Sequence, residues 1–201
     1  RTAEGWPHVD QHPRVRPGLD CVQGLVNLLP MSEASGGNVL VPGSHRELGA
    51  LATRHPGQVE ALPETEDFFA VPAGDPLADP SAFLRVHLDV GDLLLWDSRT
   101  VHCSAPSTDG ASVCDRHRLT RAVGLVCMMP REAATPAVLQ ARAAAVSQQA
   151  TTTHRPHIFC PTHEYGDWKQ RWQGNGDFRY PARPAALGPA DWALVGAGSS
   201  L

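Results

Sequence analysis

Short apolar segments separated by glycine and proline constrain the fold of this chain more than any other feature. Of its 201 residues, 18 are glycine and 18 are proline, and they recur between the apolar stretches. Such frequent turn residues favour many short strands joined by loops over a helical bundle. The length suits one domain, or one domain with an appendage. We therefore predict an all-β core, built as a β-sandwich or barrel.

Apolar runs and alternation place the expected strands, which cover residues 6–10, 21–29, 38–41, 83–88, 92–96 and 119–128. We expect residues 46–51 to form one helical turn. The Pro-, Asp- and Glu-rich stretch 56–82 is expected to be a long surface excursion with a short helix near residues 64–70. Residues 104–117 read as a polar loop.

One longer helix is expected after the last strand. Thr135-Pro136 is typical of a helix N-cap and first position, and apolar residues recur behind it at helical spacing. We therefore predict a helix over residues 136–149. The predicted organisation is a core over residues 1–130, a helix packed on it within 131–150, and an extended tail over 151–201.

Charge and cysteine content exclude several classes of function. A net charge of −4 with 19% charged residues argues against a strongly basic nucleic-acid surface. No run approaches the ~20 apolar residues of a membrane span. The five cysteines are odd in number and show no CxxC pair, which argues against a disulfide or zinc framework. A cytoplasmic or other reducing compartment is therefore expected.

Two ligand-type residues stand one residue apart near the N-terminus, in His8-Val9-Asp10. On a strand, residues i and i+2 point to the same face, with their Cα atoms about 6–7 Å apart. His102, far downstream after an apolar run, would add a third ligand from a distant strand. Two histidines and one carboxylate on one side of a metal are typical of non-haem Fe(II) oxygenases. His8, Asp10 and His102 are therefore candidate metal ligands.

Other histidines are interpreted without a metal. A second His-x-Asp occurs at His87-Leu88-Asp89, but His87 is close to His102, and Asp89 runs into Val90-Gly91-Asp92, which is typical of a strand-to-strand turn. Three histidines of the tail match no standard ligand spacing and are interpreted as surface or tail-docking residues: His154, His157 and His163.

Further segments follow His8-Val9-Asp10-Gln11 in a characteristic order. They are the apolar strand 22–29, the Gly36-Gly37 turn leading to Val39-Leu40-Val41-Pro42-Gly43-Ser44-His45, the run Gly91-Asp92-Leu93-Leu94-Leu95-Trp96-Asp97-Ser98-Arg99-Thr100-Val101-His102, and Arg121 opening an apolar strand. Over about residues 5–130 the chain thus resembles the phytanoyl-CoA dioxygenase-like family of Fe(II)/2-oxoglutarate oxygenases. The resemblance implies a double-stranded β-helix (jelly roll) with iron at one open end, held by His8, Asp10 and His102.

The resemblance also implies an arginine that pairs with the far carboxylate of 2-oxoglutarate, because guanidinium binds carboxylate bidentately and stays charged. Arg118 and Arg121 compete for this role, and being three apart they face opposite ways on a strand. We prefer Arg121, which directly opens the apolar run. The remaining candidates for contact with the cosubstrate, each with ordinary packing as the alternative, are Gln23 and Asn27 on one face of a strand, and Ser98 and Thr100 alternating with His102.

The implied activity is hydroxylation of a small organic substrate by molecular oxygen, with decarboxylation of 2-oxoglutarate to succinate. Asp10 favours hydroxylation, because halogenating relatives carry a small residue at that position. Only a short segment precedes His8, so we expect a piece of a longer protein that lacks N-terminal elements. The alternatives are a jelly-roll binding module without turnover, a truncated oxygenase with impaired turnover, or metal-dependent hydrolysis or isomerisation. The substrate and the oligomeric state stay open.

Overall fold

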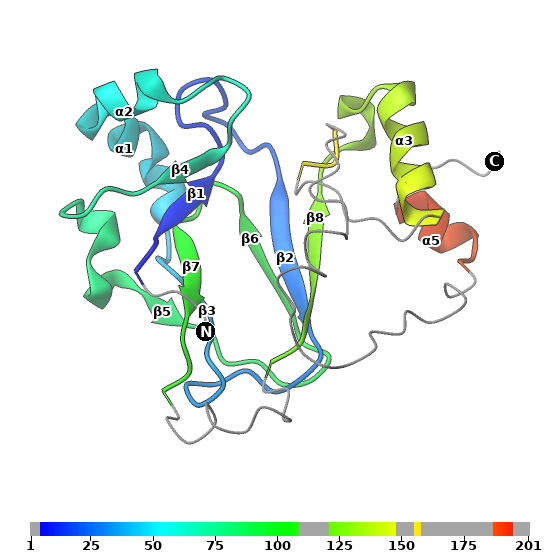
Figure 1. Ribbon diagram of the computed structural model, residues 1–201, viewed down its shortest axis with the longest axis horizontal. Coiled ribbons are helices and arrows are strands. Elements are labelled where there is room, and N and C mark those ends of the chain that lie inside the picture. The colour runs from blue at the N-terminus through cyan, green and yellow to red at the C-terminus, as the bar shows by residue number, and fades with distance from the viewer. Residues whose placement is uncertain (1–4, 109–120, 148–154, 158–186, 195–201) are drawn as a thin grey trace, which may run out of the picture. The chain divides into compact units, whose positions relative to one another are not determined.

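The computed structural model describes residues 5–108, 121–147, 155–157 and 187–194 (Figure 1). The chain divides into two compact units, residues 1–126 and 127–201. Among the described residues, the first unit holds most of the strands and the second holds the longest helix.

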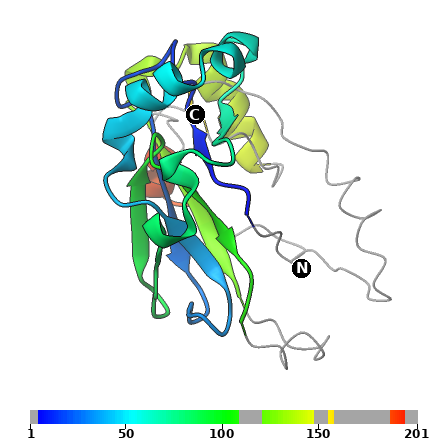
Figure 2. The same cartoon turned by 90° about the vertical axis from the view of Figure 1, so that its left-hand side faces the viewer.

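Two antiparallel sheets form the core, in agreement with the predicted all-β character. The five-stranded sheet has the order β4 (Phe68–Ala70), β1 (His8–Asp10), β7 (His102–Ala105), β3 (Gly37–Leu40) and β5 (Leu84–Arg85). The three-stranded sheet has the order β6 (Leu93–Asp97), β2 (Val22–Asn27) and β8 (Val123–Met128), and its strands lie side by side in Figure 2. This arrangement is consistent with a β-sandwich.

Short helices connect the strands of the first unit. They are η1 (Ser44–Glu47), α1 (Leu48–Arg54), α2 (Pro56–Ala61), η2 (Pro76–Ala78) and η3 (Pro80–Ala82). The second unit contains η5 (Arg131–Ala133), α3 (Pro136–Ser147) and α5 (Pro189–Leu194). None of the helices in the described part of the chain combines the length and apolar character needed to cross a bilayer.

The five-stranded sheet has one apolar face and one face that carries polar side chains. Val9 is fully buried and packs in a cluster with Phe69 of β4 and Leu51 of α1. Helices α1 and α2 lie beside this sheet, on the side away from β2 and β6 (Figure 1). Because neighbouring residues of a strand point to opposite faces, burial of Val9 against the helices turns His8 and Asp10 toward the other sheet.

Two predictions about secondary structure are wrong. The short helix expected near residues 64–70 is absent, since Phe68–Ala70 form β4 and pair with all three residues of β1. The strand expected at 92–96 is confirmed by β6. It ends at Asp97, and His102 begins a new strand that continues through Ser104 and Ala105, where a loop was predicted. In both places a pairing partner distant in sequence decided the structure.

The helix of the second unit confirms its predicted start. Thr135 Oγ1 accepts a hydrogen bond from the Val138 N–H at 3.3 Å, as expected of an N-cap. The helix is described through Ser147, and the last two residues of the prediction lie outside the described residues. The same holds for most of the predicted tail, of which residues 155–157 and 187–194 are described; the second of these segments contains α5.

A buried carboxylate organises the excursion after α2. The Asp75 side chain is fully buried and accepts hydrogen bonds from Arg54 Nε at 2.7 Å, His55 Nε2 at 2.8 Å and the Leu77 N–H at 2.9 Å. Burial by itself would raise the pKa of Asp75, but the bonds from Arg54, Leu77 and His55 outweigh it and lower the pKa to about 2. Asp75 therefore ties the excursion to the end of α1.

We expect Asp75→Asn to reduce stability and to remove part of its pH dependence. Because the pKa of Asp75 is lower in the folded state, its stabilisation is present above about pH 4 and is lost as the pH falls toward 2. The contribution at neutral pH is ~2 kcal/mol. Urea unfolding at several pH values between 2.5 and 7 measures it. The matched control is Asp79→Asn, an exposed residue at the start of η3. Equal pH dependence in wild type and Asp75→Asn would contradict the prediction.

Candidate metal centre

Three side chains with metal-binding groups meet on the polar face of the five-stranded sheet. His8 and Asp10 point the same way from β1, and His102 of β7 is the register partner of His8. Their ligand atoms all lie within 4.8 Å of one another. Asp10 Oδ1 lies 3.6 Å from His8 Nε2, and Asp10 Oδ2 lies 3.5 Å from His102 Nε2. Within the described ranges this is the one cluster of at least three such groups.

Backbone carbonyl oxygens orient both imidazoles. His8 Nδ1 lies 3.1 Å from the Trp6 carbonyl oxygen, and His102 Nδ1 lies 2.9 Å from the Thr100 carbonyl oxygen. A carbonyl only accepts, so the tautomer that makes each bond carries its proton on Nδ1. This leaves the Nε2 lone pair of each ring facing Asp10. Such outer hydrogen bonds are the usual way in which proteins orient histidine ligands.

Aromatic rings hold His8 from the side. The Trp6 ring stacks on His8 at 4.6 Å, and the Phe68 ring stacks on it at 4.7 Å. Trp96 packs near His102, with ring centroids 5.3 Å apart. These three aromatic residues were not predicted as part of the site. Trp6 was detectable in principle, because it stands two residues before His8 and therefore faces the same way on an extended chain.

Asp10 is held from the opposite sheet. Gln23 Nε2 donates a hydrogen bond to Asp10 Oδ2 at 2.8 Å, and Trp96 Nε1 donates to Gln23 Oε1 at 3.0 Å. Gln23 lies on β2 and its side chain is buried. The structure thus brings Gln23, predicted from the sequence as a core or pocket residue, into direct contact with the cluster.

The other polar candidates have different surroundings from those expected. Asn27 Nδ2 donates to the carbonyl oxygens of Leu88 and Asp89, at the turn before β6. Ser98 and Thr100 do not alternate with His102 on one strand, because both lie in the turn between β6 and β7. The Ser98 hydroxyl donates to Gln11 Oε1 at 2.6 Å. Thr100 reaches the cluster through its backbone carbonyl.

The competing motif lies at a turn. The Asp89 N–H donates to Asp92 Oδ2 at 2.8 Å, as expected for a turn residue. Neither His87 nor Asp89 belongs to the cluster around His102. Of the tail histidines, His157 alone lies within the described residues, where its Nδ1 contacts Met129 Sδ at 3.0 Å; His154 and His163 fall outside them.

The buried polar atoms that lack hydrogen-bond partners among the described residues include Arg121 Nε and Asn38 Oδ1. Arg121 precedes β8, its Nε is buried and unpaired, and burial lowers the pKa of its guanidinium. Asn38 Oδ1 is also buried and unpaired. Asn38 pairs with Ser104 on β7, two residues beyond His102, and it was missed by the sequence analysis. Arg118, the competitor of Arg121, lies outside the described residues.

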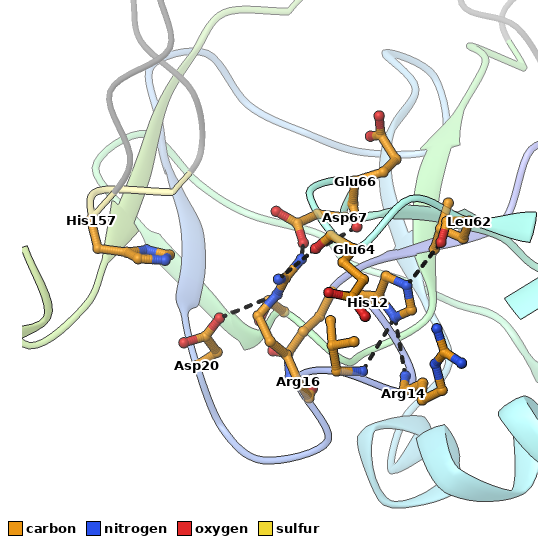
Figure 3. Close-up of polar contacts among 12 residues, drawn as sticks. His12, Arg14, Arg16, Asp20, Leu62, Glu64, Glu66, Asp67 and His157 are labelled. Carbon is orange, nitrogen blue, oxygen red and sulfur yellow. Dashed lines mark hydrogen bonds and ion pairs between the residues drawn. The ribbon is translucent and has the colours of Figure 1, made fainter. Parts of the chain in front are cut away.

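The loop that follows Asp10 is fixed to the segment that leads into β4 (Figure 3). His12 is fully buried, and its Nε2 donates to the Leu62 carbonyl oxygen at 3.3 Å. Arg16 donates to the Glu64 carbonyl oxygen at 3.0 Å and to the Asp67 carboxylate. Phe68 follows directly after Asp67, and its ring packs on His8. These contacts therefore help to fix the position of the Phe68 ring beside His8.

Comparisons with known proteins find similar sequences. The family model described as "Phytanoyl-CoA dioxygenase (PhyH)" matches residues 2–113. A curated protein from Aspergillus versicolor, named "Ava biosynthesis cluster protein O", is 33% identical over an alignment of 158 residues that covers 76% of this chain and 48% of that protein. The chain therefore spans about half the length of this relative.

We expect Arg16→Ala to destabilise the first unit by ~1–3 kcal/mol, because it removes the charged donor to the buried Asp67 carboxylate. The matched control is Arg14→Ala in the same loop, whose exposed side chain should change stability by less than ~0.5 kcal/mol. Urea unfolding of both variants measures the difference. Equal stability of the two variants would show that the Arg16 contacts do not hold the loop.

Proposed function

The chain belongs to the phytanoyl-CoA dioxygenase family, and on this premise we propose that it is an Fe(II)- and 2-oxoglutarate-dependent oxygenase that hydroxylates a small organic molecule. The observation that carries the proposal is the convergence of His8, Asp10 and His102, whose ligand atoms lie within 4.8 Å of one another. Two imidazoles and one carboxylate match the ligand preference of non-haem iron in oxygenases. The two sheets then correspond to a jelly roll that carries the site on its inner face.

The three donor side chains suit iron in their protonation states as well as in their positions. Iron takes the neutral imidazole nitrogen, and the bonds to the Trp6 and Thr100 carbonyls favour the tautomer with a free Nε2 lone pair. Asp10 supplies the negative charge. When bound, iron with 2-oxoglutarate supplies the oxidising power for insertion of oxygen into an unactivated C–H bond.

The protein's own task is to bind, orient and exclude water. We propose that the Arg121 guanidinium binds the far carboxylate of 2-oxoglutarate, because its buried Nε has no partner among the described residues. Asn38, two register pairs beyond His102, is a second candidate contact through its amide. Neither Asn27 nor Ser98 is assigned a cosubstrate contact, because both side chains are bonded to other parts of the core.

Two partly exposed aromatic rings lie beside the cluster. Trp6 and Phe68 flank His8 and remain 39% and 41% exposed. Exposed aromatic rings beside a candidate metal centre suit a substrate with an apolar body. The name of the Aspergillus relative places that protein in a biosynthesis cluster, and we propose a biosynthetic intermediate of low molecular mass as the substrate class here as well.

We expect anaerobic addition of Fe(II) and then 2-oxoglutarate to produce a visible metal-to-ligand charge-transfer band. The band requires both additions, because it arises from 2-oxoglutarate bound to the iron. His102→Ala removes one ligand and should abolish the band while the protein stays folded. Absence of the band from folded wild-type protein would reject the oxygenase and favour a binding module, or a metal site for hydrolysis or isomerisation.

The assignment of Arg121 predicts a selective defect in cosubstrate binding. Arg121→Gln should raise the 2-oxoglutarate concentration at half-maximal band intensity by at least ~10-fold, because a bidentate charged contact is lost. The affinity for Fe(II) alone should stay within about twofold. Arg118→Gln serves as the matched control. A defect in Arg118→Gln with a normal Arg121→Gln protein would reverse the assignment of the two arginines.

A further inference from the structure

Asp10 differs from the two histidines in what orients it. His8 and His102 are each fixed by a carbonyl two residues earlier in their own segment. Asp10 lies on β1 of the larger sheet, but its carboxylate accepts a hydrogen bond at 2.8 Å from Gln23 of the smaller sheet. The Gln23 side chain is buried, with the residue 4% exposed, and the Asp10 side chain is 16% exposed, so this bond is only partly open to water.

Trp96 gives the Gln23 amide a single orientation. The two residues are register partners on β2 and β6, and the indole N–H donates to Gln23 Oε1 at 3.0 Å. If the amide were reversed, Oε1 would face the Asp10 carboxylate and the amide N–H groups would face the indole N–H. Both contacts would then be repulsive, with acceptor against acceptor and donor against donor. The indole therefore ensures that Gln23 offers its N–H to Asp10.

We propose that Gln23 is a positioning residue for Asp10 and that Trp96 sets its orientation. The inference rests on the proposed function of the cluster as a metal site. The amide holds Asp10 Oδ2, so the carboxylate is already ordered in the metal-free protein. Metal binding therefore does not have to order it. This role replaces the cosubstrate contact expected for Gln23 from the sequence. Loss of such an outer contact typically lowers metal affinity ~10- to 100-fold.

Cobalt(II) is a suitable probe, because its visible absorption reports on its ligands without turnover. Gln23→Leu keeps similar volume and removes both hydrogen bonds. We expect it to weaken Co(II) binding by ~10-fold or more and to alter the Co(II) spectrum. Trp96→Phe keeps an aromatic ring and removes the indole N–H, so it should weaken binding by a smaller factor. The double variant should bind no more weakly than Gln23→Leu, because both changes act through one hydrogen-bonded chain.

Asn27→Leu is the matched control. Asn27 is a buried amide on the same face of the same strand, but it donates to the carbonyls of Leu88 and Asp89. We expect this variant to lose thermal stability while Co(II) affinity stays within about twofold of wild type. Circular dichroism melts of each variant confirm folding. If Gln23→Leu does not fold, Trp96→Phe alone carries the test.

The outcomes distinguish failure of the positioning role of Gln23 from failure of the metal site itself. Wild-type Co(II) affinity and spectrum in folded Gln23→Leu, or in Trp96→Phe where that variant alone folds, would overturn the positioning role and leave the metal site intact. Equal loss of affinity in Gln23→Leu and Asn27→Leu would also overturn it, because the effect would then be general to buried amides of β2. If wild type bound Co(II) no better than His102→Ala, the metal site itself and the positioning role would both fail.

Discussion

The position of β1 between β4 and β7 is the constraint on which the candidate site depends. A strand of three residues in the interior of a sheet has both edges paired, so its register is fixed on each side. Val9 is buried in the apolar cluster under the helices. Because neighbouring strand residues alternate, His8 and Asp10 must point to the opposite face of the sheet. A slip of one residue would bury both ligand-type side chains among aliphatic groups, at a cost of several kcal/mol for the charge alone.

The site is organised before any ligand binds. Two carbonyls set the imidazole tautomers, two aromatic rings pack on His8, and Gln23 orders the Asp10 carboxylate from across the sandwich. Each of these contacts restricts a side chain that would otherwise lose rotamer freedom when a ligand binds. Preorganisation of this kind favours affinity and defined geometry, because the entropy of ordering is lost during folding.

Two residues proposed to contact the cosubstrate each have a buried polar atom without a hydrogen bond among the described residues. A buried polar atom without a hydrogen bond costs ~1–3 kcal/mol, so proteins keep few of them. Arg121 Nε and Asn38 Oδ1 are two such atoms within the described residues. Asn38 lies two register pairs beyond His102, and Arg121 precedes β8, the strand that the family resemblance assigns to the cosubstrate. Under the proposed function, a bound 2-oxoglutarate would supply partners for both atoms.

The sequence alone determined the local features of this protein. Alternation in His8-Val9-Asp10, the frequent turn residues and the Thr135-Pro136 cap follow from steric rules that act within a few residues, and the structure has a strand, turns and a helix at these places. Tertiary structure decided the remainder. Residues 68–70 became a strand because β1 offered backbone partners, and Gln23 acquired its role because the sheets bring it to Asp10. Such contacts join positions far apart in the chain, and neither propensity nor spacing encodes which distant partner a strand or an amide will meet.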